Sequence, residues 1–218
     1  MKPWIAVVTG LPRSGTSLLM QMLEAGGLPL LYDESRRPDP DNPLGYFEYE
    51  PVKRMARDRS WLDAAVGHGV KIVLGLLAHL PRDYAYRVIL VERDLGEVMA
   101  SQRKMLARQG SGGDPTAAPN EIDEEEEALL RGLFDEQLRE IARGLREMPG
   151  VELLRVEHRE LVARPGQVAE ALNDFLCAGL GADLDVAAMA ACVDPTLYRQ
   201  RQHQSQHAPA KSDPPREG

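Results

Sequence analysis

The chain has 218 residues, of which 43% are hydrophobic and 28% charged, as expected for one folded domain with a sizeable core. The formal net charge of -8 argues against a surface that binds nucleic acid or an anionic membrane, so any anionic ligand has to be held by local groups. We expect no signal peptide, because the first predicted strand begins at Trp4, and no apolar run approaches the roughly 18 residues that span a bilayer. These features predict a cytoplasmic protein.

The chain opens with an apolar strand, a loop rich in glycine, proline and serine, and a helix that ends at residues 26–27. The loop, residues 10–17, reads Gly-Leu-Pro-Arg-Ser-Gly-Thr-Ser. Its glycines and proline permit a tight turn, in which backbone N–H groups and the positive end of the helix dipole point at one anion. This pattern predicts a phosphate cradle, and the alternative is an ordinary strand-to-helix turn.

The side chains of this loop refine the prediction. Arg13 supplies a cation, and the hydroxyls of Ser14, Thr16 and Ser17 supply neutral donors. The glycine spacing matches the nucleotide-binding loop G-x-x-x-x-G-K-[ST], but Thr16 stands where the lysine that grips the β- and γ-phosphates would be. The loop therefore has the backbone pattern of a phosphate-binding loop but lacks the lysine that would bind a nucleoside triphosphate.

Residues 30–51 contain four prolines and are predicted to form an irregular loop that lines a substrate pocket. Within it, Tyr46 and Phe47 precede Glu48. The two rings are expected to desolvate this carboxylate and raise its pKa into the range of a general base. The alternative, that Glu48 and Glu50 are solvated loop acids, stays open at this point.

The next apolar run, residues 70–74, is predicted to be a buried strand that contains a lysine. An ammonium group is costly there unless it reaches a cleft or an anion, so we expect Lys71 to neutralise a departing phosphate. His79 follows eight positions later and is expected to end a helix.

A second anchor spans residues 86–106. Residues 88–91 form a predicted central strand, and Asp94 with Glu97 has the spacing of a capping box that starts a helix. Arg93 then stands at the carboxyl end of a strand, and Ser101 lies about two turns along the helix. In an isolated segment, such an arginine would by default pair with a carboxylate, and such a serine would be a small packing residue.

The remaining segments carry no clear chemistry. Residues 109–120 are predicted to be a flexible loop that could act as a lid, and the acidic run 124–127 to begin a helix rather than bind a metal. Residues 151–157 alternate like a strand. Cys177 and Cys192 are expected to be buried reduced thiols.

The order of strands and helices predicts an α/β domain of three layers, with a central, mainly parallel sheet of the P-loop type. We expect this domain to span residues 1–202 and to be followed by a disordered tail at 203–218.

Two of these segments resemble sulfotransferases that use 3′-phosphoadenosine 5′-phosphosulfate (PAPS). Residues 11–17 resemble the family's 5′-phosphosulfate loop, and Arg93 with Ser101 eight positions later resembles its 3′-phosphate site. The resemblance covers most of residues 4–201, and two motifs in the family's order are less probable by chance than one. It implies PAPS as cofactor, a small-molecule acceptor, and as cofactor-binding residues Arg13, Ser14, Gly15, Thr16, Ser17, Arg93 and Ser101.

The resemblance also suggests catalytic roles. It implies Glu48 as the base, with Glu34 as its rival, and Arg13 and Lys71 as groups that stabilise the leaving bisphosphate without a metal. Cytosolic members follow the lysine with Thr-His, where this chain has Ile-Val, and this departure argues against His79 as the base.

Basic residues near the carboxyl end often assist cofactor binding in the family, which makes Arg199 and Arg201 candidates. Two other functions remain open: a small-molecule or nucleotide kinase that uses the same loop, and a non-catalytic adenosine-bisphosphate-binding protein. The sequence identifies neither the acceptor nor the oligomeric state.

Overall fold

The computed structural model describes residues 4–33, 36, 42, 45–101, 124–180 and 183–194. The predictions for Glu34, Arg199, Arg201, the segment 109–120 and the tail 203–218 concern residues outside these ranges.

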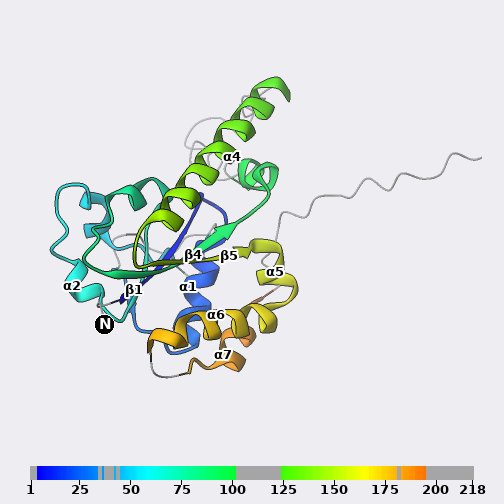
Figure 1. Ribbon diagram of the computed structural model, residues 1–218. Coiled ribbons are helices and arrows are strands. Elements are labelled where there is room, and N and C mark those ends of the chain that lie inside the picture. Colours follow the sequence, from blue (N-terminus) through cyan, green and yellow to red (C-terminus); the bar gives the residue numbers. More distant parts are fainter. Residues whose placement is uncertain are drawn as a thin grey trace, which may run out of the picture.

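The centre of the molecule is a five-stranded sheet in which every pairing is parallel (Figure 1). The strand order is β2-β3-β1-β4-β5, so β1 lies in the middle. The strands are β1 (Trp4–Gly10), β2 (Leu30–Leu31), β3 (Gly69–Lys71), β4 (Ala85–Glu92) and β5 (Val151–Glu157). The predicted α/β fold with a mainly parallel sheet is confirmed.

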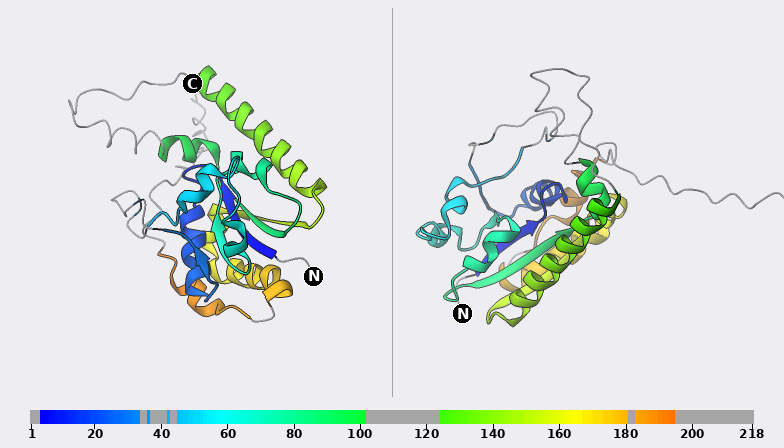
Figure 2. Two further views of the ribbon diagram at one scale, coloured as in Figure 1. Left: turned by 90° about the vertical axis from the view of Figure 1, so that its left-hand side faces the viewer. Right: turned by 90° about the horizontal axis from the view of Figure 1, so that it is seen from above.

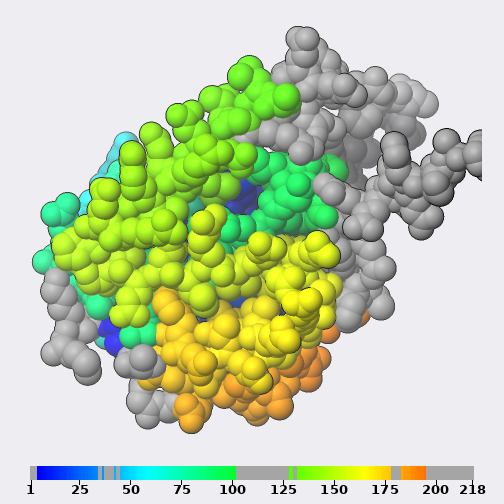
Figure 3. Space-filling view, turned by 45° about the vertical axis from the view of Figure 1, so that its right-hand side comes forward, coloured from blue at the N-terminus to red at the C-terminus, as the bar shows by residue number. Residues whose placement is uncertain are grey.

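Helices cover both faces of this sheet. The α-helices are α1 (Thr16–Ala25), α2 (Leu62–Ala65), α4 (Glu124–Glu147), α5 (His158–Ala163), α6 (Pro165–Leu180) and α7 (Val186–Ala191). Two 3-10 helices are η1 (Glu50–Arg54) and η2 (Leu74–His79), and residues 95–101 are helical. Figure 2 shows α4 on one side of the sheet and α1, α6 and α7 on the other. In the space-filling view, α4 crosses the upper part of the surface and α6 and α7 lie together below it (Figure 3).

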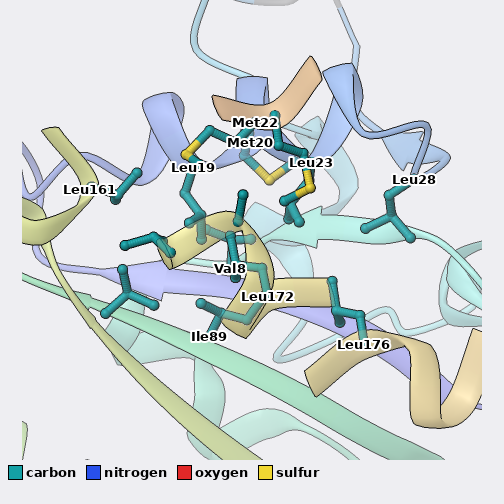
Figure 4. Close-up of a cluster of buried hydrophobic side chains, with 14 of the residues drawn as sticks. Val8, Leu19, Met20, Met22, Leu23, Leu28, Ile89, Leu161, Leu172 and Leu176 are labelled. Atoms are coloured by element: carbon teal, nitrogen blue, oxygen red, sulfur yellow. The ribbon is translucent and has the colours of Figure 1, made fainter. Parts of the chain in front are cut away.

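The two cores follow from the alternation of side chains along β1, which is buried over nearly its whole length. Ala6 and Val8 face the core with α1, α6 and α7, whereas Ile5 and Val7 face the core with α2 and the 3-10 helices. Figure 4 shows the first core, in which apolar residues of α1 meet Leu172 and Leu176 of α6. Sheet and helices therefore form the three layers that the element order predicts.

The structure departs from the sequence-based expectations at two strands. The strand expected at 70–74 ends at Lys71, because Leu74–His79 wind into η2. Leu30–Leu31, expected to be part of the irregular loop, form the edge strand β2. The first of these changes places Lys71 at a strand terminus rather than inside a strand.

Two predictions about single features have mixed outcomes. Cys177 and Cys192 form no disulfide, as expected, but both are half-buried rather than buried. His79 is the last residue of η2, as predicted.

No helix in the described part of the chain is both long and apolar enough to cross a membrane.

The strand register brings the polar residues of several strands to one edge of the sheet. Gly10 is paired with Val91, and Glu92 is paired with Glu157. The residues that follow β1, β4 and β5 therefore leave the sheet in one row. In a parallel sheet with this kind of strand order, ligands bind beyond the carboxyl ends of the strands, next to the central strand.

Candidate functional site

The loop after β1 is bent by two residues with positive φ. Gly15 has φ 104°, and Arg13 has φ 70°, a conformation that costs a side-chain-bearing residue roughly 1–2 kcal/mol. The Ser14 N–H donates to the Leu11 carbonyl at 3.1 Å and closes the turn. No side chain caps α1 at Gly15, so the first N–H groups of the helix keep their capacity to bind an anion.

The two glycines of this loop are required by their neighbours. A Cβ atom on Gly10 would lie 2.6 Å from the Val91 carbonyl oxygen of β4. A Cβ atom on Gly15 would lie 2.3 Å from Cδ2 of His158, the first residue of α5. The loop is thus held in shape by the ends of two other strands, and it suits a ligand that needs a fixed row of backbone donors.

The second anchor meets this loop directly. Arg13 Nε donates to Ser101 Oγ at 3.0 Å, and Arg93 Nη1 donates to the Arg13 carbonyl oxygen at 3.1 Å. Arg93 Nε also donates to Glu97 Oε2 at 2.9 Å. Two segments separated by about 80 residues of sequence therefore form one cluster at the sheet edge, with two guanidinium groups, one hydroxyl and one carboxylate.

A third cation reaches the loop from β3. Lys71 Nζ donates to Ser17 Oγ at 3.1 Å and to the Tyr46 carbonyl oxygen at 2.9 Å. Asn42 Nδ2 donates to the same Ser17 oxygen at 3.0 Å. Because Ser17 Oγ accepts two hydrogen bonds, its own proton can be donated. Ser17 and the Tyr46 carbonyl occupy two of the three N–H donors of Lys71.

Burial lowers the pKa of Lys71 to about 8. Glu48 opposes this shift, whereas the positive charges of Arg36 and Arg13 add to it. Lys71 thus stands within electrostatic reach of both the loop and Glu48, and an anion bound beside it would favour its charged form.

The surroundings of Glu48 are more ionic than the sequence suggests. Arg36 contacts its carboxylate at 3.0 Å, and Lys53 contacts it at 3.7 Å. The guanidinium of Arg36 stacks over the Tyr46 ring, 3.4 Å from its centroid, and the Phe47 ring packs edge-on against Tyr32. Both rings that were expected to desolvate Glu48 are buried, while Glu48 itself is paired with cations and is a quarter exposed.

The hydroxyls of the loop are not equivalent. Ser14 is 1% exposed, and its Oγ has no hydrogen-bond partner among the described residues. Thr16 is also buried, whereas Ser17 is half-buried and holds the contacts to Lys71 and Asn42. Of the three candidates, Ser17 is the hydroxyl that lies beside a cation.

His158 is a site residue that the sequence analysis did not single out. It follows β5 as Arg93 follows β4, packs against Gly15, and is 7% exposed. Burial, with a smaller effect of the Arg93 charge, lowers the pKa of His158 to about 4, so the ring is neutral at pH 7. The rule that selected Arg93, a polar residue at the carboxyl end of a parallel strand, would also have found His158.

Arg36 and Asn42 were missed as well, and their proline-rich surroundings offered no periodic signal that could have found them. The structure thus brings together Arg13, Gly15, Ser17, Lys71, Arg93 and Ser101. Within the described ranges, no group of three or more His, Cys, Asp or Glu residues has the arrangement of a metal site. The cations of this cluster and the N–H groups at the start of α1 can bind an anion such as a phosphate group.

Neither a protein-family model nor a curated protein sequence matches this chain. Solved structures do resemble it. The sulfotransferase domain of the olefin synthase from Synechococcus PCC 7002 is 19% identical, with a TM-score of 0.49 over 91% of this chain and 83% of that chain. The sulfotransferase domain from the curacin biosynthetic pathway is 16% identical, with a TM-score of 0.46 over 80% of this chain and 74% of that chain.

An unliganded sugar kinase from Janibacter sp. HTCC2649 is 13% identical, with a TM-score of 0.42 over 83% of this chain and 98% of that chain. Likenesses at this level do not separate a sulfotransferase from a kinase. The choice between them rests on the residues at the sheet edge.

Proposed function

We propose that this protein is a sulfotransferase that moves a sulfuryl group from PAPS to a hydroxyl or amine of a small-molecule acceptor. The observation that carries the proposal is the contact between the loop 10–17 and the pair Arg93 and Ser101. A nucleotide with phosphates at both its 5′ and 3′ positions needs two anion sites on one edge of the sheet, and these two segments supply them.

In this proposal, the loop amides and the Ser17 hydroxyl bind the 5′-phosphosulfate, and Arg93 and Ser101 bind the 3′-phosphate. Arg13 lies between the two, because its carbonyl contacts Arg93 and its side chain contacts Ser101. PAPS would supply the sulfuryl group, and adenosine 3′,5′-bisphosphate would leave with the electrons of the broken S–O bond. Arg13 and Lys71 would stabilise the negative charge of the leaving group.

Glu48 is the proposed base that takes the acceptor's proton as the new bond to sulfur forms. It follows the Tyr46 carbonyl that Lys71 contacts by two residues, and its charge acts on the pKa of Lys71. Arg36 and Lys53 pair with this carboxylate. Replacing Glu48 with Gln is expected to lower turnover about 100-fold and to leave the affinity for adenosine 3′,5′-bisphosphate within about threefold of wild type. Unchanged turnover in a cofactor-saturated assay would remove Glu48 from the mechanism.

A kinase is the second candidate, and one observation favours it. Lys71 brings an ammonium group to Ser17 and thereby replaces the cation that Thr16 cannot provide. The neighbouring strand ends weigh against a kinase, because a magnesium-dependent enzyme needs a carboxylate there to hold the metal. β3 ends in Lys71, and the carboxylate of Glu92 at the end of β4 is bound by Arg155.

Calorimetric titration separates the two candidates and the non-catalytic alternative. We expect adenosine 3′,5′-bisphosphate to bind at least tenfold more tightly than ATP with magnesium, because ATP has no 3′-phosphate to contact Arg93 and Ser101. Tight binding of ATP with magnesium and no binding of the bisphosphate would overturn the proposal. Binding of the bisphosphate without sulfuryl transfer to any member of a panel of phenols, alcohols, amines and sugars would favour a non-catalytic protein.

A further inference from the structure

We propose that Glu97 is a positioning residue that orients Arg93 and thereby sets the preference of the site for a nucleotide with a 3′-phosphate. This inference rests on the proposed function, since it concerns the ligand of the same cluster. Glu97 enters the sequence analysis only as part of a helix-capping motif. In the structure, its side chain accepts a hydrogen bond from Arg93.

The contacts of Arg93 define its orientation. Its Nε donates to Glu97 Oε2 at 2.9 Å, and its Nη1 donates to the Arg13 carbonyl at 3.1 Å. A guanidinium group is planar, so two contacts on different nitrogens fix the directions of all its remaining N–H groups. The side chains of Arg93 and Glu97 are only 9% and 12% exposed, so water competes little for this pair.

Glu97 is itself fixed by the start of the helix. Its backbone N–H donates to Asp94 Oδ1 at 3.0 Å, and Arg93 stands four residues before it, just ahead of the helix that begins at residue 95. A chain of contacts therefore runs from Asp94 through Glu97 and Arg93 to the backbone of Arg13. Arg13, which has a positive φ, is thus held by a hydrogen bond from Arg93 of the second anchor.

An electrostatic role and a positioning role of Glu97 predict opposite effects on the binding of the 3′-phosphate. If the charge of Glu97 were all that mattered, removing it would strengthen the binding of a phosphate, because the cluster would lose its negative group. If Glu97 orients Arg93, removing the side chain weakens the binding of the 3′-phosphate although the site becomes more positive. The two effects can be distinguished, because glutamine keeps an acceptor oxygen at the same chain length without the charge.

The test measures the dissociation constants of adenosine 3′,5′-bisphosphate and adenosine 5′-monophosphate for the wild type, E97A and E97Q. The dissociation constant of the monophosphate divided by that of the bisphosphate reports the preference for the 3′-phosphate and cancels effects on the rest of the nucleotide. We expect E97A to lower the ratio about tenfold, since it loses the charge-assisted contact to Arg93, and E97Q to keep it within about threefold. Thermal melting of each variant shows whether it is folded.

Three results would overturn the inference. If E97A keeps the wild-type ratio, Arg93 needs no support from Glu97. If E97A and E97Q both bind the bisphosphate more tightly, the effect of Glu97 is electrostatic alone. If E97A binds both ligands equally weakly and melts at a lower temperature, Glu97 has a general structural role. A wild type that does not prefer the bisphosphate over the monophosphate would instead contradict the proposed function.

A matched control is available on α4. Asp135 and Arg139 form an ion pair with the same four-residue spacing, 4.0 Å apart, and both side chains are exposed. Because this pair lies outside the cluster, D135A is expected to leave the ratio of the two dissociation constants unchanged. A change in D135A as large as that in E97A would show that the ratio responds to helix stability rather than to Arg93.

Discussion

The loop 10–17 and the segment 45–54 approach the same sheet edge but are held there in different ways. The loop is fixed by its backbone, by two glycines that touch Val91 and His158, and by contacts from Arg93. Glu48 in the segment is held by ion pairs with Arg36 and Lys53, and these side chains are 25% to 55% exposed. Exposed ion pairs of this kind contribute roughly 0–1 kcal/mol each, whereas a clash in a packed loop costs several times more.

This difference indicates that the nucleotide side of the proposed site is rigid and the acceptor side adaptable. A rigid cradle suits one invariant ligand, because donors placed in advance require no reorganisation when it binds. A carboxylate held by flexible cations can adjust to acceptors of different shape. Lys71 joins the two regions, since it contacts Ser17 on one side and the Tyr46 carbonyl on the other.

The largest expected effect comes from the substitution G15A. The new Cβ would lie 2.3 Å from His158 Cδ2, and alanine is strained at the φ of 104°. We expect the free energy of unfolding to fall by about 4 kcal/mol and the affinity for adenosine 3′,5′-bisphosphate to fall at least tenfold. Urea denaturation and calorimetry measure the two quantities.

The control for this substitution is G67A. Gly67 has φ 75°, but its Cβ would meet no atom within 4 Å, so only the backbone strain of about 1 kcal/mol is expected. Adding H158A to G15A removes the clash and should recover part of the lost stability. Equal losses in G15A and G67A would mean that contact with His158 does not shape the loop.

An intermediate effect is expected from K71M, and it depends on pH. The pKa of Lys71 is about 8 in the folded protein and about 10.5 in an unfolded chain. Between these values, the unfolded chain keeps a proton that the folded protein has released, so the wild type gains stability as the pH rises. We expect its free energy of unfolding to increase by about 3 kcal/mol relative to K71M between pH 8 and 10.5, as measured by urea denaturation.

The control is K53M, which removes a lysine whose pKa is raised by its hydrogen bond to Glu50. Between pH 8 and 10.5, the free energy of unfolding of the wild type should not increase relative to that of K53M. Parallel pH profiles for the wild type and K71M would show that Lys71 is not buried in the way that the structure indicates.

The contrast between the two regions also explains what the sequence could predict. The loop and the second anchor depend on local patterns, namely an apolar strand, turn residues and a helix start, and the parallel sheet then aligns their ends. The meeting of Arg13 with Ser101 follows from these rules together with the chain order. His158 follows from the same rule but was not inferred, because no chemistry was assigned to the segment after residues 151–157.

The acceptor side could not be predicted in the same way. The partners of Glu48 come from Arg36 and Lys53, which stand in an irregular stretch and a 3-10 helix, and no period relates them to the carboxylate. The sequence suggested an apolar environment because Tyr46 and Phe47 are adjacent to Glu48. Adjacent residues do not share an environment when the backbone turns, and Phe47 has a positive φ of 52°.

The smallest expected effect, and the one that most directly tests the adaptable side, comes from K53M. Lys53 contacts Glu50 at 2.7 Å and Glu48 at 3.7 Å, but its side chain is 55% exposed. Because water and salt screen such pairs, we expect the free energy of unfolding at neutral pH to change by less than about 0.5 kcal/mol. Since the pKa of Lys53 is raised in the folded protein, any stabilisation is present below the unfolded pKa and disappears as the pH rises through the folded value. A loss above about 1 kcal/mol that persists in high salt would mean that Glu48 is held as firmly as the loop, and the distinction between a rigid and an adaptable side would fail.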